Sequence, residues 1–238
     1  MNPRNFVLVH GAWHGGWCWS RVAEILCSRG HRVTAPTQTG LGERSHLLTD
    51  SITLQTFVDD IIQHVNFEEL NEVVFVGHSY GGISITGVAD QMPGCVSKLI
   101  FLDAVLLDSG ETWFDFLPTE VIEKRKELAM ETSGGLSVPP PSAEAFGVQR
   151  PDDIAFLASR LTPHPINTYR TNLTLENRIG NGLPASYVSC TEPRFDPVTV
   201  SLNRAQDFGW PITQIATGHD AMVTEPQAVA DLLEELAG

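Results

Sequence analysis

Basic residues, cysteines and long apolar runs are all scarce in this chain, and each shortage excludes a class of protein. Lys and Arg number 15 against 29 Asp and Glu, so the formal net charge is −14, and the acidic residues are scattered along the chain. Binding to nucleic acid or to an anionic membrane surface needs clustered Lys and Arg that neutralise phosphate. We therefore expect neither partner, and we interpret the charge as a source of solubility.

The pattern of cysteines and histidines argues against a metal or redox site. Four cysteines are present without the C-x-x-C spacing of such sites: Cys18, Cys27, Cys95 and Cys190. We expect them to be small buried apolar side chains. His10 and His14 are four residues apart, but they lie in a predicted loop and lack a carboxylate at zinc-ligand spacing, so no metal is expected.

The sequence also gives no sign of a membrane span or a signal peptide. No apolar run reaches the roughly 18 residues of a membrane span. The first apolar stretch, residues 6–9, is too short for the central region of a signal peptide, and no cleavage site follows it. The sequence therefore predicts a cytoplasmic protein.

The order of strand-like and helix-like segments predicts an α/β fold. With 238 residues, 42% of them hydrophobic, the chain can bury the core of one catalytic domain. Strand and helix signals alternate over the first hundred residues, as in a mostly parallel sheet with helices on both faces. The expected strands there are 6–10, 32–37, 73–78 and 96–104, and the expected helices are 17–29, 53–67 and 80–91.

The pattern changes between residues 106 and 184, where the chain is polar and rich in proline. This stretch is too long for a loop, so we expect an inserted helical cap that contains helices at 119–130 and 152–160. Afterwards the sheet pattern resumes, with strands at 185–190 and 211–216 and helices at 198–207 and 226–236. The predicted core is therefore 1–105 together with 185–238, and the cap is inserted before the last two strands.

A buried strand at 73–78 runs into Gly77-His78-Ser79-Tyr80-Gly81, a G-x-S-x-G pentapeptide, and then into a helix. A serine at such a sharp turn is held out of the helix in strained backbone geometry, which requires small residues two positions before and two positions after it. Gly77 and Gly81 meet that requirement. Ser79 is therefore the predicted nucleophile.

Ser79 needs a general base, and only His164 and His219 follow it in the sequence. His164 lies between two prolines in the predicted cap, whereas His219 follows the last predicted strand directly, where the base of a serine triad on such a sheet is expected. An oxyanion hole needs two backbone N–H groups, one after the nucleophile and one after the first strand. Tyr80 and Ala12 occupy these positions, and His10 is expected to be structural.

The acid that orients the base has three candidates. The usual position follows the strand at 185–190, but Pro193 stands there, with Glu192 and Asp196 on either side. Asp103 ends the strand after the predicted turn, and a carboxylate at the carboxyl end of a parallel strand lies on the ligand-binding side of the sheet. We favour Asp103, with Asp196 and then Glu192 as alternatives.

Four segments, 9–19, 76–82, 102–104 and 217–222, together resemble the α/β-hydrolase superfamily. They are most similar to a branch of small esterases that includes plant methyl esterases, hydroxynitrile lyases and bacterial pyrethroid-type carboxylesterases. The resemblance covers both flanks of the chain but not the predicted cap. It implies a cytoplasmic serine hydrolase with a Ser-His-Asp triad, no cofactor and an aromatic pocket.

Aromatic residues gather where a substrate would lie, and Trp13 and Trp113 are the pocket candidates. We expect a carboxylesterase that cleaves small apolar or aromatic esters through an acyl-enzyme. The alternatives are a lactonase or amidase, a proton-abstracting enzyme of the hydroxynitrile lyase or cofactor-independent dioxygenase type, and a non-catalytic receptor. The expected partner is a small-molecule ester, and homodimer formation is left open.

Overall fold

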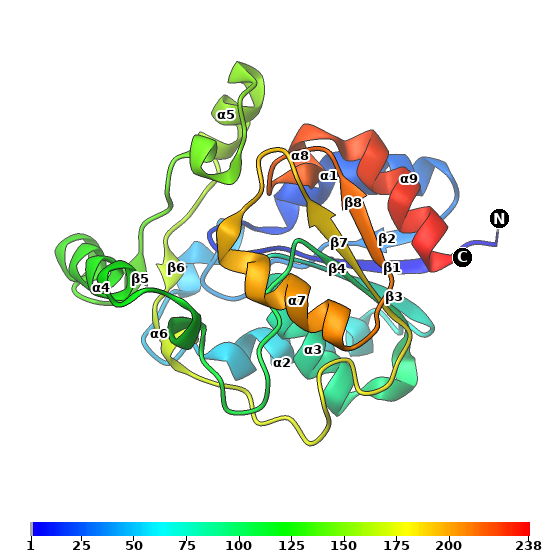
Figure 1. Cartoon of the computed structure of the whole chain (residues 1–238), viewed down its shortest axis with the longest axis horizontal. Helices are drawn as coiled ribbons and strands as arrows, with labels where there is room; N and C mark the ends of the chain where they lie inside the picture. Colours follow the sequence, from blue (N-terminus) through cyan, green and yellow to red (C-terminus); the bar gives the residue numbers. More distant parts are fainter. Residues whose placement is uncertain (1) are drawn as a thin grey trace.

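The computed structural model describes residues 2–238, so Met1, the first residue of the predicted core, lies outside the described residues. Its centre is one six-stranded sheet with the order β2-β1-β3-β4-β7-β8 (Figure 1). Every neighbouring pair in it is parallel. The strands are β1 (Asn5–Val9), β2 (Arg32–Thr34), β3 (Val73–His78), β4 (Val96–Leu102), β7 (Ala185–Cys190) and β8 (Ile212–Ile215).

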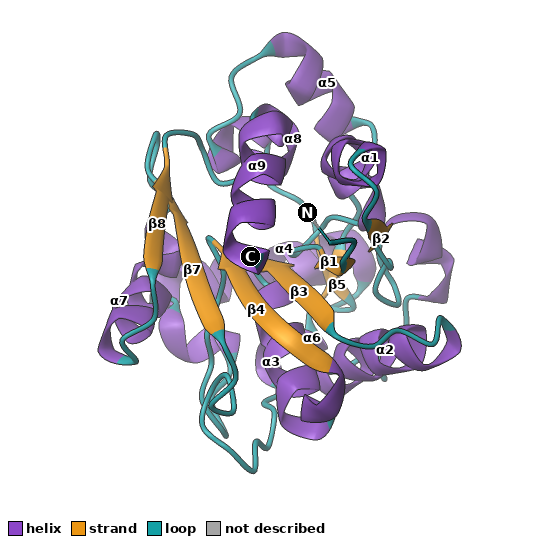
Figure 2. Ribbon diagram, turned by 90° about the vertical axis from the view of Figure 1, so that its right-hand side faces the viewer, coloured by secondary structure: helices purple, strands orange, loops and turns teal. Residues whose placement is uncertain are grey.

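Helices cover both faces of this sheet, as Figures 1 and 2 show. On one face lie α1 (Ser20–Ser28), α8 (Ala221–Thr224) and α9 (Pro226–Ala237). On the other face lie α2 (Leu54–Phe67), α3 (Gly81–Gln91) and α7 (Thr199–Asp207). The predicted α/β architecture is therefore confirmed, because parallel strands need a helical crossover between them and a helical layer on each face.

The sequence of the central elements explains their positions. All six residues of β3 are buried, as expected for a strand with neighbours on both sides and helices on both faces. Helix α2 begins after Thr53, whose side chain forms a capping box with Thr56, and it buries one apolar stripe. Helix α3 is buried along residues 81–89, since it packs against both the sheet and α2. These elements fix the turn at Ser79 in the interior of the molecule.

In the segment between β4 and β7 the helices and short strands lie at the left of Figure 1, and residues 171–184 then run along the bottom of the molecule to β7. The elements of this segment are η4 (Trp113–Phe116), α4 (Thr119–Ser133), β5 (Ser137–Val138), η5 (Ala143–Phe146), α5 (Pro151–Ala158), β6 (His164–Pro165) and α6 (Asn167–Arg170). Strands β5 and β6 form a small antiparallel pair, so the segment is not purely helical. None of the helices in residues 2–238 is both long enough and apolar enough to span a membrane.

Several predicted boundaries and one burial prediction were wrong. The expected helix 17–29 begins as the 3-10 helix η1 (Gly16–Trp19) before α1, and the expected strand 96–104 ends at Leu102 because Asp103 has a φ of +43°. Cys18, Cys95 and Cys190 are buried, as expected, but Cys27 is exposed. It follows Leu26 by one position on α1, a step of about 100° around the helix, and so faces away from the core.

Candidate active site

The turn between β3 and α3 holds Ser79 in the left-handed region of the backbone, with a φ of +51°. Its neighbouring glycines are required by close packing. A Cβ atom on Gly77 would lie 2.9 Å from the Gly81 carbonyl oxygen, and one on Gly81 would lie 2.6 Å from the Val9 carbonyl oxygen. Larger residues would push the turn apart, so the glycines permit the strained turn that presents the serine side chain.

Three side chains form a continuous chain of hydrogen bonds at the carboxyl ends of the strands. His219 Nε2 lies 2.8 Å from Ser79 Oγ, and His219 Nδ1 lies 2.7 Å from Asp103 Oδ2. Since the carboxylate can only accept when ionised, Nδ1 carries the proton and Nε2 is free to accept the serine proton. Asp103 and His219 are both buried, whereas Ser79 is partly open to solvent.

Hydrogen bonds to the neighbouring strand β7 fix the position of Asp103. Its backbone N–H donates to the Val188 carbonyl (2.7 Å), and its Oδ1 accepts from the Cys190 N–H (3.1 Å). The two alternative carboxylates, Glu192 and Asp196, are exposed, and neither hydrogen-bonds to a histidine in the described part of the chain. The structure therefore brings Asp103 to His219 and leaves the other two candidates outside.

The loop that carries His219 is anchored from the inserted segment. The His219 N–H donates to the Phe146 carbonyl at 2.9 Å, and His78 Nε2 donates to the His219 carbonyl at 2.9 Å. Gly218 packs against the same segment so closely that a Cβ atom there would lie 2.8 Å from the Phe146 carbonyl oxygen. The glycine before the histidine is therefore required by this contact.

The two predicted oxyanion donors both lie at the cavity next to Ser79. Ala12 follows β1, and Tyr80 follows the serine. Within residues 2–238 neither N–H donates a hydrogen bond. A buried N–H group is normally paired, so these two donors are available to a ligand oxygen.

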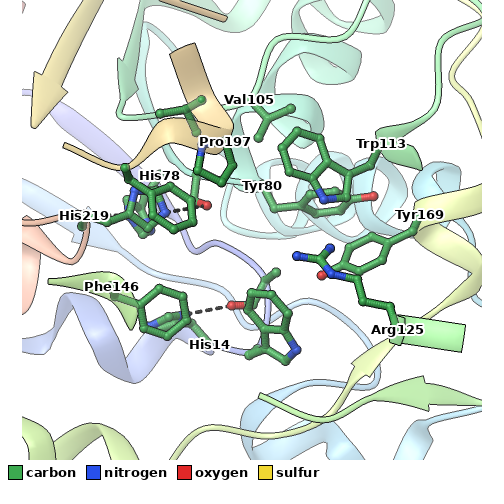
Figure 3. Close-up of a pocket in the computed structure, with 15 residues that line it drawn as sticks. His14, His78, Tyr80, Val105, Trp113, Arg125, Phe146, Tyr169, Pro197 and His219 are labelled. Atoms are coloured by element: carbon green, nitrogen blue, oxygen red, sulfur yellow. Dashed lines mark hydrogen bonds between the residues drawn. The ribbon is translucent and has the colours of Figure 1, made fainter. Parts of the chain in front are cut away.

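Ser79 lines a cavity whose mainly aromatic wall is shown in Figure 3. Both pocket candidates, Trp13 and Trp113, line it. Trp13 Nε1 donates to the Val138 carbonyl at 3.0 Å, and the Tyr80 hydroxyl donates to the Thr168 carbonyl at 2.7 Å, so these two polar groups are satisfied. The Phe195 ring stacks on the His219 ring with centroids 4.0 Å apart. The wall suits a flat apolar group.

The other histidines near the site have structural partners. His10 Nδ1 lies 2.9 Å from the Gly11 carbonyl and its Nε2 accepts from the Gln38 N–H, while burial lowers the pKa of His10 to about 3. His164 is buried in the inserted segment, bonded to Thr168 Oγ1 at 2.8 Å, and burial holds its pKa well below the ordinary value. His10 is therefore structural, as expected, and no hydrogen bond joins His164 to Ser79.

A second His–Asp pair was not predicted as such. His14 Nε2 lies 3.1 Å from Asp220 Oδ2, and His14 Nδ1 donates to the Ala12 carbonyl at 2.7 Å. Burial opposes both charges, but their mutual attraction and hydrogen bonds outweigh it, so the pKa of His14 is raised and that of Asp220 is lowered. The residues are 206 positions apart, so no local pattern could have joined them.

The chain belongs to the Alpha/beta hydrolase family, which matches residues 6–232. A relative from Nocardioides sp. (strain SG-4G), the carbendazim hydrolyzing esterase, is 37% identical and covers 98% of this chain and 99% of its own. Methylesterase 7 of Arabidopsis thaliana is 28% identical over 99% of this chain and 97% of its own. The predicted resemblance to small esterases is thus confirmed.

A solved structure supports the fold. An extracellular alpha/beta-hydrolase from a Paenibacillus species superposes with a TM-score of 0.84 at 22% identity, covering 98% of this chain and 99% of its own. At that identity the likeness concerns the fold alone. It extends over the inserted segment as well as the sheet, because nearly the whole of each chain is matched.

Proposed function

We propose that this protein is a serine carboxylesterase that hydrolyses small esters with apolar or aromatic groups through an acyl-enzyme. The observation that carries the proposal is the hydrogen-bonded order Ser79, His219, Asp103, with distances of 2.8 and 2.7 Å. The relatives add support, since one is named as an esterase that hydrolyses carbendazim and the other as a methylesterase. The aromatic cavity in front of Ser79 suits the substrate class.

In the first half of the reaction, Ser79 Oγ attacks the ester carbonyl carbon while His219 Nε2 takes its proton. Asp103 holds His219 in the required tautomer and stabilises the imidazolium that forms. The carbonyl oxygen becomes negative and accepts hydrogen bonds from the N–H groups of Ala12 and Tyr80. His219 then donates the proton to the leaving alkoxide, the C–O bond breaks, and an acyl-serine and an alcohol result.

In the second half, water replaces the alcohol. His219 takes a proton from water, the hydroxide attacks the acyl-serine carbonyl, and the same two N–H groups bind the oxyanion. Collapse releases the acid, and the proton returns to Ser79. Each half-reaction needs one base, and the free Nε2 of His219 is the group in position to supply it.

Replacing the nucleophile tests the proposal. In S79A, kcat/KM for 4-nitrophenyl butyrate should fall about 10³- to 10⁶-fold, because no acyl-enzyme can form. Circular dichroism should be unchanged, since Ser79 is partly exposed and its Oγ has only His219 as a partner. S45A is a matched control, because Ser45 is an exposed serine that does not line the cavity at Ser79. Activity of S79A within tenfold of the unmodified protein would contradict the proposal.

A burst experiment separates ester hydrolysis from proton abstraction on the same fold. A proton-abstracting enzyme would use His219 without acylating Ser79. The esterase should release one equivalent of 4-nitrophenol per active site in a fast first phase whenever deacylation is the slower step. It should also be labelled by a fluorophosphonate at Ser79. Turnover of an ester by protein that has been fully labelled at Ser79 would contradict the acyl-enzyme route.

A further inference from the structure

Two polar groups on the wall of the catalytic cavity have no hydrogen-bond partner among the residues that the structure describes. Arg125 comes from α4 and Tyr169 from α6, and both line the cavity with Ser79. The Nη1 atom of Arg125 and the hydroxyl of Tyr169 are buried, and neither makes a hydrogen bond within residues 2–238. Figure 3 shows the guanidinium of Arg125 beside the hydroxyl end of Tyr169. Burying such groups unpaired is costly, which points to a missing acceptor.

The position of Arg125 is set by aromatic rings rather than by a carboxylate. Its guanidinium carbon lies 5.6 Å from the Trp13 ring centroid and 5.2 Å from that of Tyr169. In the described part of the chain no Asp or Glu forms an ion pair with it, whereas Arg204 has Glu111 and Arg21 has Asp153. Stacking on aromatic rings leaves the edge of the guanidinium free for two parallel hydrogen bonds.

Resting on the proposed esterase function, we propose that Arg125 and Tyr169 form a subsite that binds a carboxylate group carried by the substrate at a distance from the scissile ester. The guanidinium supplies charge-assisted donors, the Tyr169 hydroxyl supplies a further donor, and the aromatic wall contacts the body of the substrate. The substrate class is thereby narrowed from apolar esters to monoesters that also bear a carboxylate.

The shape of the cavity places this subsite at a boundary. The cavity at Ser79 has a volume of about 30 Å³. A second, outer cavity of about 690 Å³ is lined largely by α4 and by residues 138–141. Trp13 and Arg125 line both cavities, so they form the wall between them. The subsite therefore lies where the catalytic cavity meets the larger outer one, beside the path of a group carried by the substrate.

Matched substrates test the subsite in both halves of the ester. For the acyl half the pair is mono-4-nitrophenyl glutarate and 4-nitrophenyl valerate, which differ in a terminal carboxylate. For the alcohol half the pair is 4-carboxyphenyl butyrate and phenyl butyrate. The quantity compared is the ratio of kcat/KM between unmodified protein and R125M, because this ratio cancels differences in leaving-group chemistry. Met keeps an unbranched apolar stem and removes every donor.

For the carboxylate member of at least one pair, R125M should lower kcat/KM about 10- to 100-fold, mainly through KM, as loss of a charge-assisted hydrogen bond predicts. The uncharged members should change less than about threefold. R125K should recover part of the loss, and Y169F should lose about three- to tenfold in the same pair. K126M is the matched control, since Lys126 is on the same helix, pairs with Glu123 and lines neither cavity.

Two results would overturn the subsite. One is an equal R125M effect on both members of both pairs, and the other is a preference for the carboxylate that survives in R125M. Titration of Ser79 with a fluorophosphonate gives the active fraction of each variant, so misfolding cannot imitate either result. One outcome is that the unmodified protein hydrolyses the uncharged esters through Ser79, while R125M and the unmodified protein show the same preference between the two members of each pair. In that case the subsite proposal is wrong and the esterase proposal stands. If S79A also hydrolyses the uncharged esters, the esterase proposal fails.

Discussion

Two buried His–Asp pairs lie within this one site. They differ in the hydrogen-bond partner of the imidazole nitrogen that does not face the carboxylate. In the pair His219–Asp103, Nδ1 faces the carboxylate at 2.7 Å and Nε2 faces Ser79 Oγ. In the pair His14–Asp220, Nε2 faces the carboxylate at 3.1 Å and Nδ1 donates to the Ala12 carbonyl. The first imidazole has one nitrogen free to exchange a proton with a substrate, whereas both nitrogens of the second are occupied.

The comparison teaches that a buried His–Asp pair is not by itself a catalytic device. His219 and Asp220 are neighbours in the sequence, yet each belongs to a different pair. The His14–Asp220 pair joins the loop of Ala12, the proposed oxyanion donor, to the loop of His219, the proposed base. We infer that the first pair moves protons and that the second holds two loops together.

The largest expected difference between the pairs is in turnover. D103N should lower kcat for 4-nitrophenyl butyrate about 10³- to 10⁴-fold, because the amide no longer stabilises the required tautomer or the imidazolium. D220N should lower kcat less than about tenfold per folded molecule, because Asp220 does not face the proton that moves. Steady-state kinetics on folded, titrated protein measures both.

Two controls accompany this prediction. D196N and E192Q should stay within about threefold of the unmodified protein, since both carboxylates are exposed and away from His219. A loss in D196N comparable to that in D103N would assign the acid differently. A large loss of kcat in folded D220N would erase the distinction between the two pairs.

The next effect is on stability. D220N should lower the free energy of unfolding by about 3 kcal/mol near pH 6, because it leaves the buried His14 without its counter-ion. The pKa of His14 is higher in the folded protein than in the unfolded chain. Its contribution to the free energy of unfolding is therefore fully present below the unfolded pKa, about 6.5, and is lost as the pH rises through the folded pKa. The lowered pKa of Asp220 makes its contribution complete above about 3.9 and lost in stronger acid.

The pH window of D220N therefore tests the pairing. The loss of stability should be greatest between about pH 4 and 6.5 and should shrink as the pH rises above 6.5, through the raised pKa of His14. Urea unfolding at several pH values, with D231N as a control for an exposed carboxylate on α9, measures this. A D220N effect that does not vary with pH would show that His14 is neutral in the folded protein.

A smaller effect comes from the histidines that are kept neutral. The pKa of His164 lies well below its ordinary value, so the unfolded chain binds a proton there that the folded protein does not. Its contribution is complete above the unfolded pKa and is lost as pH falls below about 6.5, at about 1.4 kcal/mol per pH unit. His10, with a pKa of about 3, acts in the same direction.

In H164Q the free energy of unfolding should therefore fall less steeply between about pH 6.5 and 5, because one proton fewer is taken up on unfolding. This change of slope is expected whatever the substitution does to stability at neutral pH. Urea unfolding over this range measures the slope. H46Q is the control, because His46 is exposed. An H164Q slope identical to that of the unmodified protein would contradict the neutral state of His164.

Much of the fold could be predicted from local pattern. The apolar run of β3, the capping residue of α2 and the glycines around Ser79 each leave a signal within a few neighbouring residues. The strands β5 and β6 were missed because two residues each are too few to show alternation. The location in the cytoplasm, the boundaries of core and cap, and the oligomeric state stay predictions.

The candidate site could be predicted only in part, for a related reason. Ser79 lies in a local motif, whereas the choice among Asp103, Asp196 and Glu192 depends on which strand end meets His219 in space. That meeting is set by the parallel neighbours β4 and β7, which bring Asp103 to the Cys190 N–H. The sequence did not single out Arg125 as a binding residue. Its proposed role depends on the lack of a carboxylate partner among the described residues, which only the folded structure shows.

The carbonyl of Phe146 has a consequence for how this architecture can vary. This carbonyl belongs to the inserted segment and accepts a hydrogen bond from the backbone N–H of His219. It also packs against Gly218, where a Cβ atom would not fit. The inserted segment therefore cannot be replaced without affecting the position of the proposed catalytic histidine. Grafting a foreign insertion onto this sheet, to give it another substrate range, would succeed only where the donor supplies a peptide oxygen at that one point.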